Sequence, residues 1–346
     1  MVSPSRREVE EVAEYFGVNT NFDEKLSDYP VDVYSVSLPE LPPRVRVYVV
    51  YSPEARALAC FPHIIGKGFE RLNAYLAAKS IEAVVDLAGL DGEEVVHLHV
   101  LRAGPGYQLH KGLRDKLGLL REVYIRPLYS DDRSSIEVVY SNFSSLPEAS
   151  EVTVVAPDTI ATGNTLIVAL DQLKRESEDR GTALRKLVIY GFVADKGLAR
   201  VVKRSMELGF REVYVFALVD VAALASNDYD IVLYGPDLSN REGKVLGGIA
   251  PLEVLEECAP YYVPGLDQPG DWSARQCWLF NGRSLERGNF EKHLRGVRAA
   301  VQKVLEEHSS QPWFKAWHKD ACKRVLAAVN ATYRELVRTC KYGYYP

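Results

Sequence analysis

The residues with the clearest chemical meaning lie in the stretch VTVVAPDTIATGNTL, residues 152–166. An apolar run typical of a buried strand ends at Asp158, and a loop of threonine and glycine then opens an amphipathic helix. The first N–H groups of a helix have no partner within it, so such a loop can bind phosphate, with Gly163 allowing close approach and Thr162 and Thr165 adding hydroxyls. The alternative is an ordinary strand-to-helix turn with Thr165 near the cap.

Two further segments combine glycine with polar or aromatic residues. The first, HVLRAGPG at residues 99–106, carries Arg102, and a guanidinium meets phosphate oxygens with paired donors. The second, YVPGLDQPGD at residues 262–271, begins with a tyrosine that follows Tyr261. These two tyrosines either stack on a planar heterocycle or are core or rim residues, and the sequence leaves both interpretations open.

Taken together, the three segments resemble motifs of the type I phosphoribosyltransferases. Residues 152–166 are similar to the family's phosphoribosyl pyrophosphate loop, and residues 99–106 resemble the pyrophosphate loop of its uracil-specific branch, Leu-Arg-Ala-Gly-Leu-Gly. Residues 262–271 are similar to that branch's base-binding segment, Ile-Val-Pro-Gly-Leu-Gly-Asp-Ala-Gly-Asp. The resemblance covers residues 66–280 and leaves out both ends of the chain.

The resemblance implies a fold and a reaction. The fold would be α/β, with a central parallel sheet flanked by helices and with a hairpin arm, here followed by a C-terminal helical extension. The reaction would transfer ribose 5-phosphate from phosphoribosyl pyrophosphate to uracil or a related base, releasing pyrophosphate, with Mg²⁺ on the diphosphate. Such a step depends on alignment and charge stabilisation more than on a strong protein base.

Carried over by position, the resemblance also implies roles for single residues. The catalytic residues would be Arg102, Arg126 and Asp158. The phosphoribosyl pyrophosphate would contact Ala103, Gly104, Thr159, Ala161, Thr162, Gly163, Asn164 and Thr165. The base would contact Tyr261, Tyr262, Val263, Gly265 and Asp267. Mg²⁺ would lie near Gln268 and Asp271, in part through water.

The chain departs from the family pattern at four positions, namely Pro157, Asn164, Asp267 and Gln268. Binding of the phosphorylated sugar tolerates these changes better than uracil specificity does. Three hypotheses therefore stay open: an active transferase, a regulator of the same fold that binds phosphoribosyl pyrophosphate or a nucleotide, and a structural oligomer that keeps a phosphate site. The family usually pairs its subunits, so we expect a homodimer.

Apolar spacing indicates the elements that would position these residues. From residue 66 on, apolar strands alternate with amphipathic helices, as in a parallel α/β sheet. We predict strands at residues 45–51, 95–101, 152–156, 187–192, 213–218 and 231–234, and a hairpin over residues 123–143. We predict helices after Ser5, at 165–175, around 198–206, and over most of the last 60 residues.

Composition limits the compartment and the partners. Residues 287–346 hold 12 basic and 5 acidic residues, whereas the first 286 hold 30 and 42. The basic residues of the C-terminal helices are typical of a solvated face, so we do not expect a nucleic-acid partner. The charged N-terminus lacks a signal-peptide core and no run is long enough to span a bilayer, so we expect a cytoplasmic protein without a membrane partner.

We predict that the chain divides into an N-terminal extension (1–60), a phosphoribosyltransferase-like domain (61–284) and a basic helical extension (285–346).

His97 and His99 share one face of a predicted strand, and this spacing suits metal binding. Because the sequence offers no third ligand, we prefer the interpretation that both histidines are packed residues.

Overall fold

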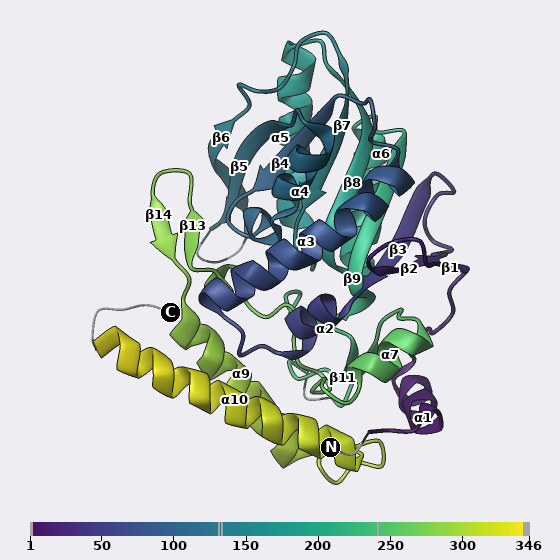
Figure 1. Ribbon diagram of the computed structural model, residues 1–346, viewed down its shortest axis with the longest axis vertical. Coiled ribbons are helices and arrows are strands. Elements are labelled where there is room, and N and C mark those ends of the chain that lie inside the picture. The colour runs from purple at the N-terminus through teal and green to yellow at the C-terminus, as the bar shows by residue number, and fades with distance from the viewer. Residues whose placement is uncertain (1–2, 131, 133, 241, 342–346) are drawn as a thin grey trace.

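The computed structural model describes residues 3–130, 132, 134–240 and 242–341 of the chain, and a ten-stranded mixed sheet lies at their centre (Figure 1). The order is β1-β2-β3-β9-β8-β7-β4-β5-β6, with β10 paired to β9. Strands β3, β9, β8, β7, β4 and β5 run parallel, and the others pair antiparallel. The strands are β1 Glu24–Leu26, β2 Asp32–Val36, β3 Val45–Tyr51, β4 Val95–Val100, β5 Arg121–Tyr129, β6 Ile136–Asn142, β7 Glu151–Pro157, β8 Ala183–Ala194, β9 Glu212–Leu224 and β10 Ile231–Val232.

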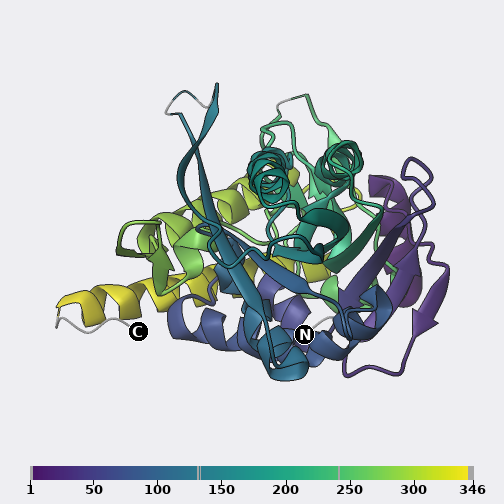
Figure 2. The same ribbon diagram turned by 90° about the horizontal axis from the view of Figure 1, so that it is seen from above.

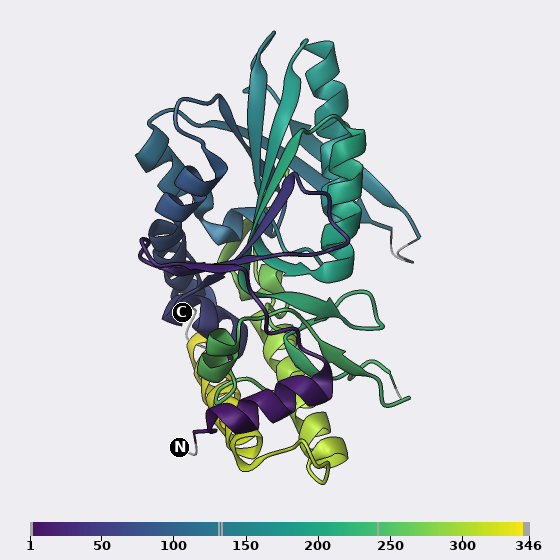
Figure 3. The same cartoon turned by 90° about the vertical axis from the view of Figure 1, so that its right-hand side faces the viewer.

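The central strands are apolar along their length because helices cover both faces of the sheet. Every residue of β4 is buried, and so is all of β9 after its first residue. Figure 3 shows α3 on one side of the sheet and the pair α5 and α6 on the other. The covering helices are α2 Pro53–Cys60, α3 Gly66–Ala88, α4 Leu109–Leu117, α5 Asn164–Asp179 and α6 Asp195–Glu207.

Strands β5 and β6 form the predicted arm, which projects from the body of the molecule (Figure 2). Strand β5 pairs with β4 as far as Ile125, and its pairing with β6 continues to Tyr129. The register shifts between Arg126 and Pro127, at the place where the arm leaves the sheet. Arg126 therefore lies at the junction between the sheet and the arm.

The C-terminal helices α9 (Phe290–His308) and α10 (Ala316–Lys341) pack against each other. Their shared apolar side contains Leu294, Val301, Cys322 and Val325. Trp313, between the helices, packs edge-on against Phe16 of α1 (Arg6–Phe16), with ring centroids 4.9 Å apart. Ser5 caps α1 in a capping box, which confirms that predicted helix start.

Short elements connect the sheet to these helices. They are η1 Gly104–Tyr107, β11 Tyr234–Pro236, β12 Val245–Gly247, α7 Leu252–Cys258, α8 Trp272–Arg275, β13 Trp278–Phe280 and β14 Leu285–Arg287. The predicted strand at 231–234 is corrected, because it is divided between β10, which pairs antiparallel with β9, and β11, which pairs with β12. A glycine at residue 235 with φ of 142° lies within the second of these pairs.

The structure confirms the predicted fold class: a largely parallel central sheet, helices on both faces, a hairpin arm and a C-terminal helical region. The N-terminal strand β3 pairs with β9 in this same sheet. Residues 342–346 of the predicted helical extension lie outside the described residues. Among the described helices, none has the length and apolar character that crossing a membrane would require.

Candidate functional site

A cavity of about 310 Å³ lies where β4, β5 and β7 leave the sheet. Residues 100–103, 126–129, 158–166 and 269–273 line it, together with Asp228, Tyr229 and Asp267. Ligands of open α/β sheets bind outside the carboxyl ends of the strands, which is where this cavity lies. All three segments singled out in the sequence therefore contribute to one cavity.

The loop after β7 presents backbone donors to the cavity. Its N-cap residue Gly163 has φ of 79°, helix α5 begins at the next residue, and no side chain caps the helix. The first N–H groups of α5 therefore remain available for an anion, and Thr165 lies two residues after the N-cap. The cavity is lined by Thr159, Ala161, Thr162, Gly163, Asn164 and Thr165.

Gly163 is required mainly by packing between helices. A Cβ at this position would lie 2.6 Å from Cγ2 of Val201 and 2.9 Å from the carbonyl oxygen of Gly197, both on α6. The side chain of Asn164 is also committed, because its Oδ1 accepts a hydrogen bond of 2.6 Å from Arg200. Arg200 in addition donates to the carbonyl of Thr162, which links the loop to α6.

Asp158 is the most enclosed acid of the loop, with 5% of its surface exposed. Its Oδ1 accepts a hydrogen bond of 2.9 Å from the N–H of Thr159. Burial raises the pKa of Asp158 to about 7, because removal from water disfavours the charged form. The hydroxyl of Tyr107 supports the loop from behind by bonding to Oγ1 of Thr159 at 2.5 Å.

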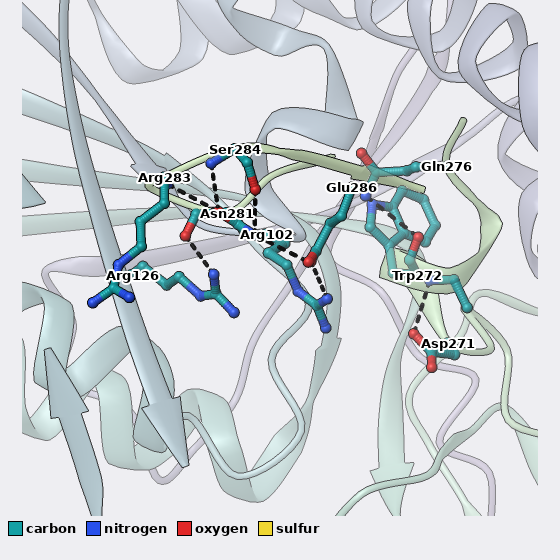
Figure 4. A network of polar contacts seen from close by, with 10 residues as sticks. Arg102, Arg126, Asp271, Trp272, Gln276, Asn281, Arg283, Ser284 and Glu286 are labelled. Atoms are coloured by element: carbon teal, nitrogen blue, oxygen red, sulfur yellow. Dashed lines mark hydrogen bonds and ion pairs between the residues drawn. The ribbon is translucent and has the colours of Figure 1, made fainter. Parts of the chain in front are cut away.

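Arg102 and Arg126 form the cationic side of the cavity (Figure 4). Arg102 follows a cis peptide bond after β4 and pairs with Glu286 of β14. Arg126 donates to the backbone carbonyl of Asn281, in the same hairpin as Glu286. Burial and the neighbouring charge of Arg102 lower the pKa of Arg126. Two guanidinium groups so close together favour an anion with several charges.

The rest of the pyrophosphate segment lies partly in the cavity and partly behind it. Ala103 lines the cavity, whereas Gly104 is buried and is not among the described lining residues. A Cβ on Gly104 would lie 2.8 Å from the carbonyl oxygen of Pro157. A glycine at this position therefore lets the two loops of the cavity approach each other.

The predicted base-binding residues Tyr261, Tyr262 and Val263 lie away from this cavity, and their role at a base stays a prediction. Tyr262 is fully buried, and its hydroxyl donates to the carbonyl of Leu266 at 2.5 Å. Tyr261 lines a separate cavity against α10, and Val263 packs with the apolar residues of α9 and α10. None of the three is among the described residues that line the cavity.

Gln268 is not among the described lining residues of the cavity, and its role near a metal stays a prediction. It is fully buried, and its Nε2 donates to both carboxylate oxygens of Asp220 at 2.9 and 3.1 Å. Burial raises the pKa of Asp220 to about 8. Asp271 does line the cavity, where its Oδ1 caps α8 by accepting from the N–H of Ala274.

A second cavity of about 630 Å³ adjoins the first and shares Tyr229, Asp267, Gly270 and Asp271 with it. Gly265, a predicted base contact, lines this second cavity, and helix α9 closes its far side. Asp267 accepts a hydrogen bond of 2.9 Å from the N–H of Ile231. Burial, followed by the charge of Asp230, raises the pKa of Asp267 well above its usual range.

Sequence reasoning missed three contributors to the site. Trp272 lines the first cavity and stacks on Tyr107, with ring centroids 4.3 Å apart. Tyr229 lines both cavities, and Glu286 pairs with Arg102. Trp272 directly follows a quoted motif and was open to prediction, whereas the other two lie in segments without a motif.

The donor set fits Mg²⁺ that arrives with a diphosphate. Among the described residues, no group of three histidine, cysteine or acidic side chains converges as a metal site. Carboxylates of Asp158, Asp228, Asp267 and Asp271 line the cavity, and Mg²⁺ is commonly held by one or two carboxylates plus substrate phosphates.

The histidines of β4 are packed residues, as preferred from the sequence. His97 is fully buried, and its ring centroid lies 4.2 Å from that of His99. His99 bonds through Nε2 to Glu122 at 2.8 Å. Burial, followed by the neighbouring His99, lowers the pKa of His97 well below its usual range, so its ring is neutral at ordinary pH.

No family model and no curated protein matches the chain. Among solved structures, the AQ2163 protein of Aquifex aeolicus is 19% identical, with a TM-score of 0.40 over 54% of this chain and 91% of that chain. The adenine phosphoribosyltransferase of Trypanosoma brucei is 14% identical, with a TM-score of 0.35 over 53% and 86%. The orotate phosphoribosyltransferase of Mycobacterium tuberculosis is 17% identical, with a TM-score of 0.29 over 48% and 90%. These likenesses are weak.

Proposed function

We propose that the protein is a phosphoribosyltransferase, which transfers ribose 5-phosphate from phosphoribosyl pyrophosphate to uracil or a related base and releases pyrophosphate. One observation carries this proposal: the two arginines, the open end of α5 and Asp158, which begins the loop after β7, line the same cavity. A ligand with a phosphate at one end and a diphosphate at the other matches this distribution of donors.

Each group has a role that follows from its position. The N–H groups that open α5 bind the 5-phosphate, and Asp158 accepts hydrogen bonds from the ribose hydroxyls. Arg102 and Arg126 bind the diphosphate and stabilise the charge that develops as pyrophosphate leaves the anomeric carbon. Mg²⁺, when bound with the diphosphate near Asp158 and Asp271, would neutralise part of the same charge.

The second cavity is our candidate for the base. It opens into the first beside Asp267 and Asp271, and Tyr229 lines both cavities. Because the pKa of Asp267 is raised, its carboxyl can carry a proton and donate to a base carbonyl. This property is compatible with uracil, whose carbonyl groups are hydrogen-bond acceptors.

The direct test is pyrophosphate release with phosphoribosyl pyrophosphate, Mg²⁺ and a panel of pyrimidine and purine bases. We expect turnover on at least one pyrimidine and its loss in Asp158→Ala. A panel without any pyrophosphate release would exclude the transferase.

One observation favours a second function, a regulator that binds the same sugar phosphate without turnover. Arg102 and Arg126 are both engaged by the β13–β14 hairpin, which leads directly into α9. Calorimetry separates the two functions, because a regulator binds phosphoribosyl pyrophosphate with Mg²⁺ and shows no heat of reaction when bases are added.

A further inference from the structure

The hairpin formed by β13 and β14 holds both cationic side chains of the cavity. Glu286 of β14 pairs with Arg102, and the carbonyl of Asn281 accepts from Arg126 (Figure 4). Asn281 also donates through Nδ2 to Oε2 of Glu286 at 3.1 Å. One carboxylate and one carbonyl oxygen therefore occupy donors that a bound diphosphate would use.

The hairpin is held to the rest of the protein by few apolar contacts. The side chains of Trp278, Phe280 and Leu285 are 53%, 37% and 64% exposed, and only Leu279 of the strand residues is buried, at 3%. A two-stranded hairpin is marginally stable by itself. Its position over the arginines therefore depends largely on the polar contacts.

The base of the hairpin is fixed more firmly than its tip. The N–H of Gly288 donates to the carbonyl of Gln276 at 3.1 Å, and a Cβ at Gly288 would lie 2.2 Å from that oxygen. At the tip, Phe280 contacts Tyr140 of the arm edge-on, with centroids 5.7 Å apart. A Cβ at Gly282 of the tip would lie 2.6 Å from the Tyr140 side chain, so release of the tip from the arginines requires it to move relative to the arm.

A ligand can replace Glu286 at Arg102 at a small cost in free energy. Their side chains are 40% and 31% exposed, and an ion pair in such a position stabilises little because water competes for both charges. A diphosphate carries several charges and can bridge Arg102 and Arg126, which a single carboxylate does not do. The ligand therefore has the stronger interaction with the same two groups.

We propose that the β13–β14 hairpin is an autoinhibitory strap, in which Glu286 occupies the diphosphate-binding arginines until a diphosphate displaces it. This inference rests on the proposed function, because it takes Arg102 and Arg126 as the diphosphate site. The strap leads through residues 288–289 into α9, the helix that lines the second cavity.

The opposite role for Glu286 would be to orient Arg102 for the ligand. The two roles differ in the sign of their effect on affinity. Glu286→Gln keeps the shape of the side chain and removes its charge, so it strengthens diphosphate binding if Glu286 competes and weakens it if Glu286 orients. Glu291→Gln is the matched control, because Glu291 forms an exposed pair with Arg295 on α9.

The experiment is calorimetric titration of inorganic pyrophosphate with Mg²⁺ into the full chain and both variants. We expect Glu286→Gln to bind about fivefold more tightly than the parent chain, near the upper limit for an exposed ion pair. The control should bind as the parent does. Equal or weaker binding by Glu286→Gln overturns the strap.

Limited trypsin digestion gives a second measurement that does not depend on a variant. Arg283 is exposed at the tip of the hairpin, and we expect cleavage after it to accelerate when pyrophosphate and Mg²⁺ are added. Protection of this bond by pyrophosphate would overturn the strap, because it would mean that the hairpin closes on the ligand.

The outcomes also separate the strap from the transferase. If Glu286→Gln binds pyrophosphate more tightly but no base supports turnover, the strap stands and the transferase fails. If turnover is found while Glu286→Gln and the parent bind equally, the transferase stands and the strap fails. If neither protein binds pyrophosphate, both are wrong.

Discussion

Two walls of the cavity differ in the polar groups that they present to a ligand. The phosphate wall, made of Arg102, Arg126 and residues 158–166, presents guanidinium groups and backbone N–H donors. The acceptor wall, made of Tyr229, Asp267 and residues 269–273, presents carboxylates and aromatic rings. On the first wall the arginine charges are permanent, whereas on the second the raised pKa of Asp267 makes charge depend on the surroundings.

The difference indicates where affinity and where specificity arise. Arginine is charged at every ordinary pH, so the phosphate wall supplies binding energy to any anion of suitable shape. Behind the acceptor wall, Gln268 and Asp220 are already bonded to each other, so this region supplies rigidity. Discrimination between bases then depends on cavity shape and on the proton of Asp267.

The largest effect should come from removing a permanent charge of the phosphate wall. We expect Arg102→Ala to weaken binding of phosphoribosyl pyrophosphate with Mg²⁺ by about 100-fold, as for loss of a charge-assisted hydrogen bond pair. Calorimetric titration measures this change. Arg121→Ala is the control, because Arg121 begins β5 and pairs with Glu94 away from the cavity. A loss of the same size in the control would show that charge alone, and not position, governs binding.

Gln268, behind the acceptor wall, should contribute to stability and not to ligand binding. We expect Gln268→Leu to lower the free energy of unfolding by about 2 kcal/mol, because it leaves the carboxyl of Asp220 buried without its partner. Urea unfolding measures this change, and the Mg²⁺ dependence of ligand binding should stay the same. Loss of the Mg²⁺ dependence with unchanged stability would restore the original prediction that Gln268 lies near the metal.

The phosphate wall could be predicted from the sequence because backbone topology determines it. A parallel sheet brings the carboxyl ends of β4 and β7 together, so Arg102 and Asp158 had to lie near each other once those strands were recognised. The apolar runs that form these strands are visible in the sequence. The packing that requires a glycine at position 163 could not be predicted, because it involves Val201 of another helix.

The acceptor wall could not be predicted to the same extent. Residues 262–271 form no regular strand, so the sequence shows no alternation from which to tell buried from exposed positions. Tyr262 lies in the core, where the carbonyl of Leu266 accepts its hydrogen bond. Of the neighbours Asp267 and Gln268, only Asp267 is among the described residues that line the cavity. The division of the chain at residues 60 and 284 stays a prediction.

Asp158 provides a pH test of the phosphate wall, because Asp158→Asn removes its titration and leaves that of Asp267 in place. Its pKa of about 7 means that the carboxyl is mainly neutral at pH 6 and mainly charged at pH 8. The charged form accepts hydrogen bonds from ribose hydroxyls and favours Mg²⁺, so affinity for the ligand should rise about tenfold between these values. Asp158→Asn removes this contribution and keeps the titration of the ligand itself. A profile that is the same in both proteins would mean that Asp158 does not contact the ligand.

The smallest effect should distinguish Tyr229, which the sequence did not single out, from Tyr261, which it predicted at the base. Tyr229 lines both cavities, whereas Tyr261 packs edge-on against Phe61 beside α10, with centroids 5.5 Å apart. We expect Tyr229→Ala to raise the KM for the base about fivefold, as for loss of one stacking contact, with the KM for phosphoribosyl pyrophosphate unchanged. Tyr261→Ala is the matched substitution and should leave both values unchanged. If Tyr261→Ala alone raises the KM for the base, the base lies against α10, and the acceptor wall has been placed on the wrong side of residues 262–271.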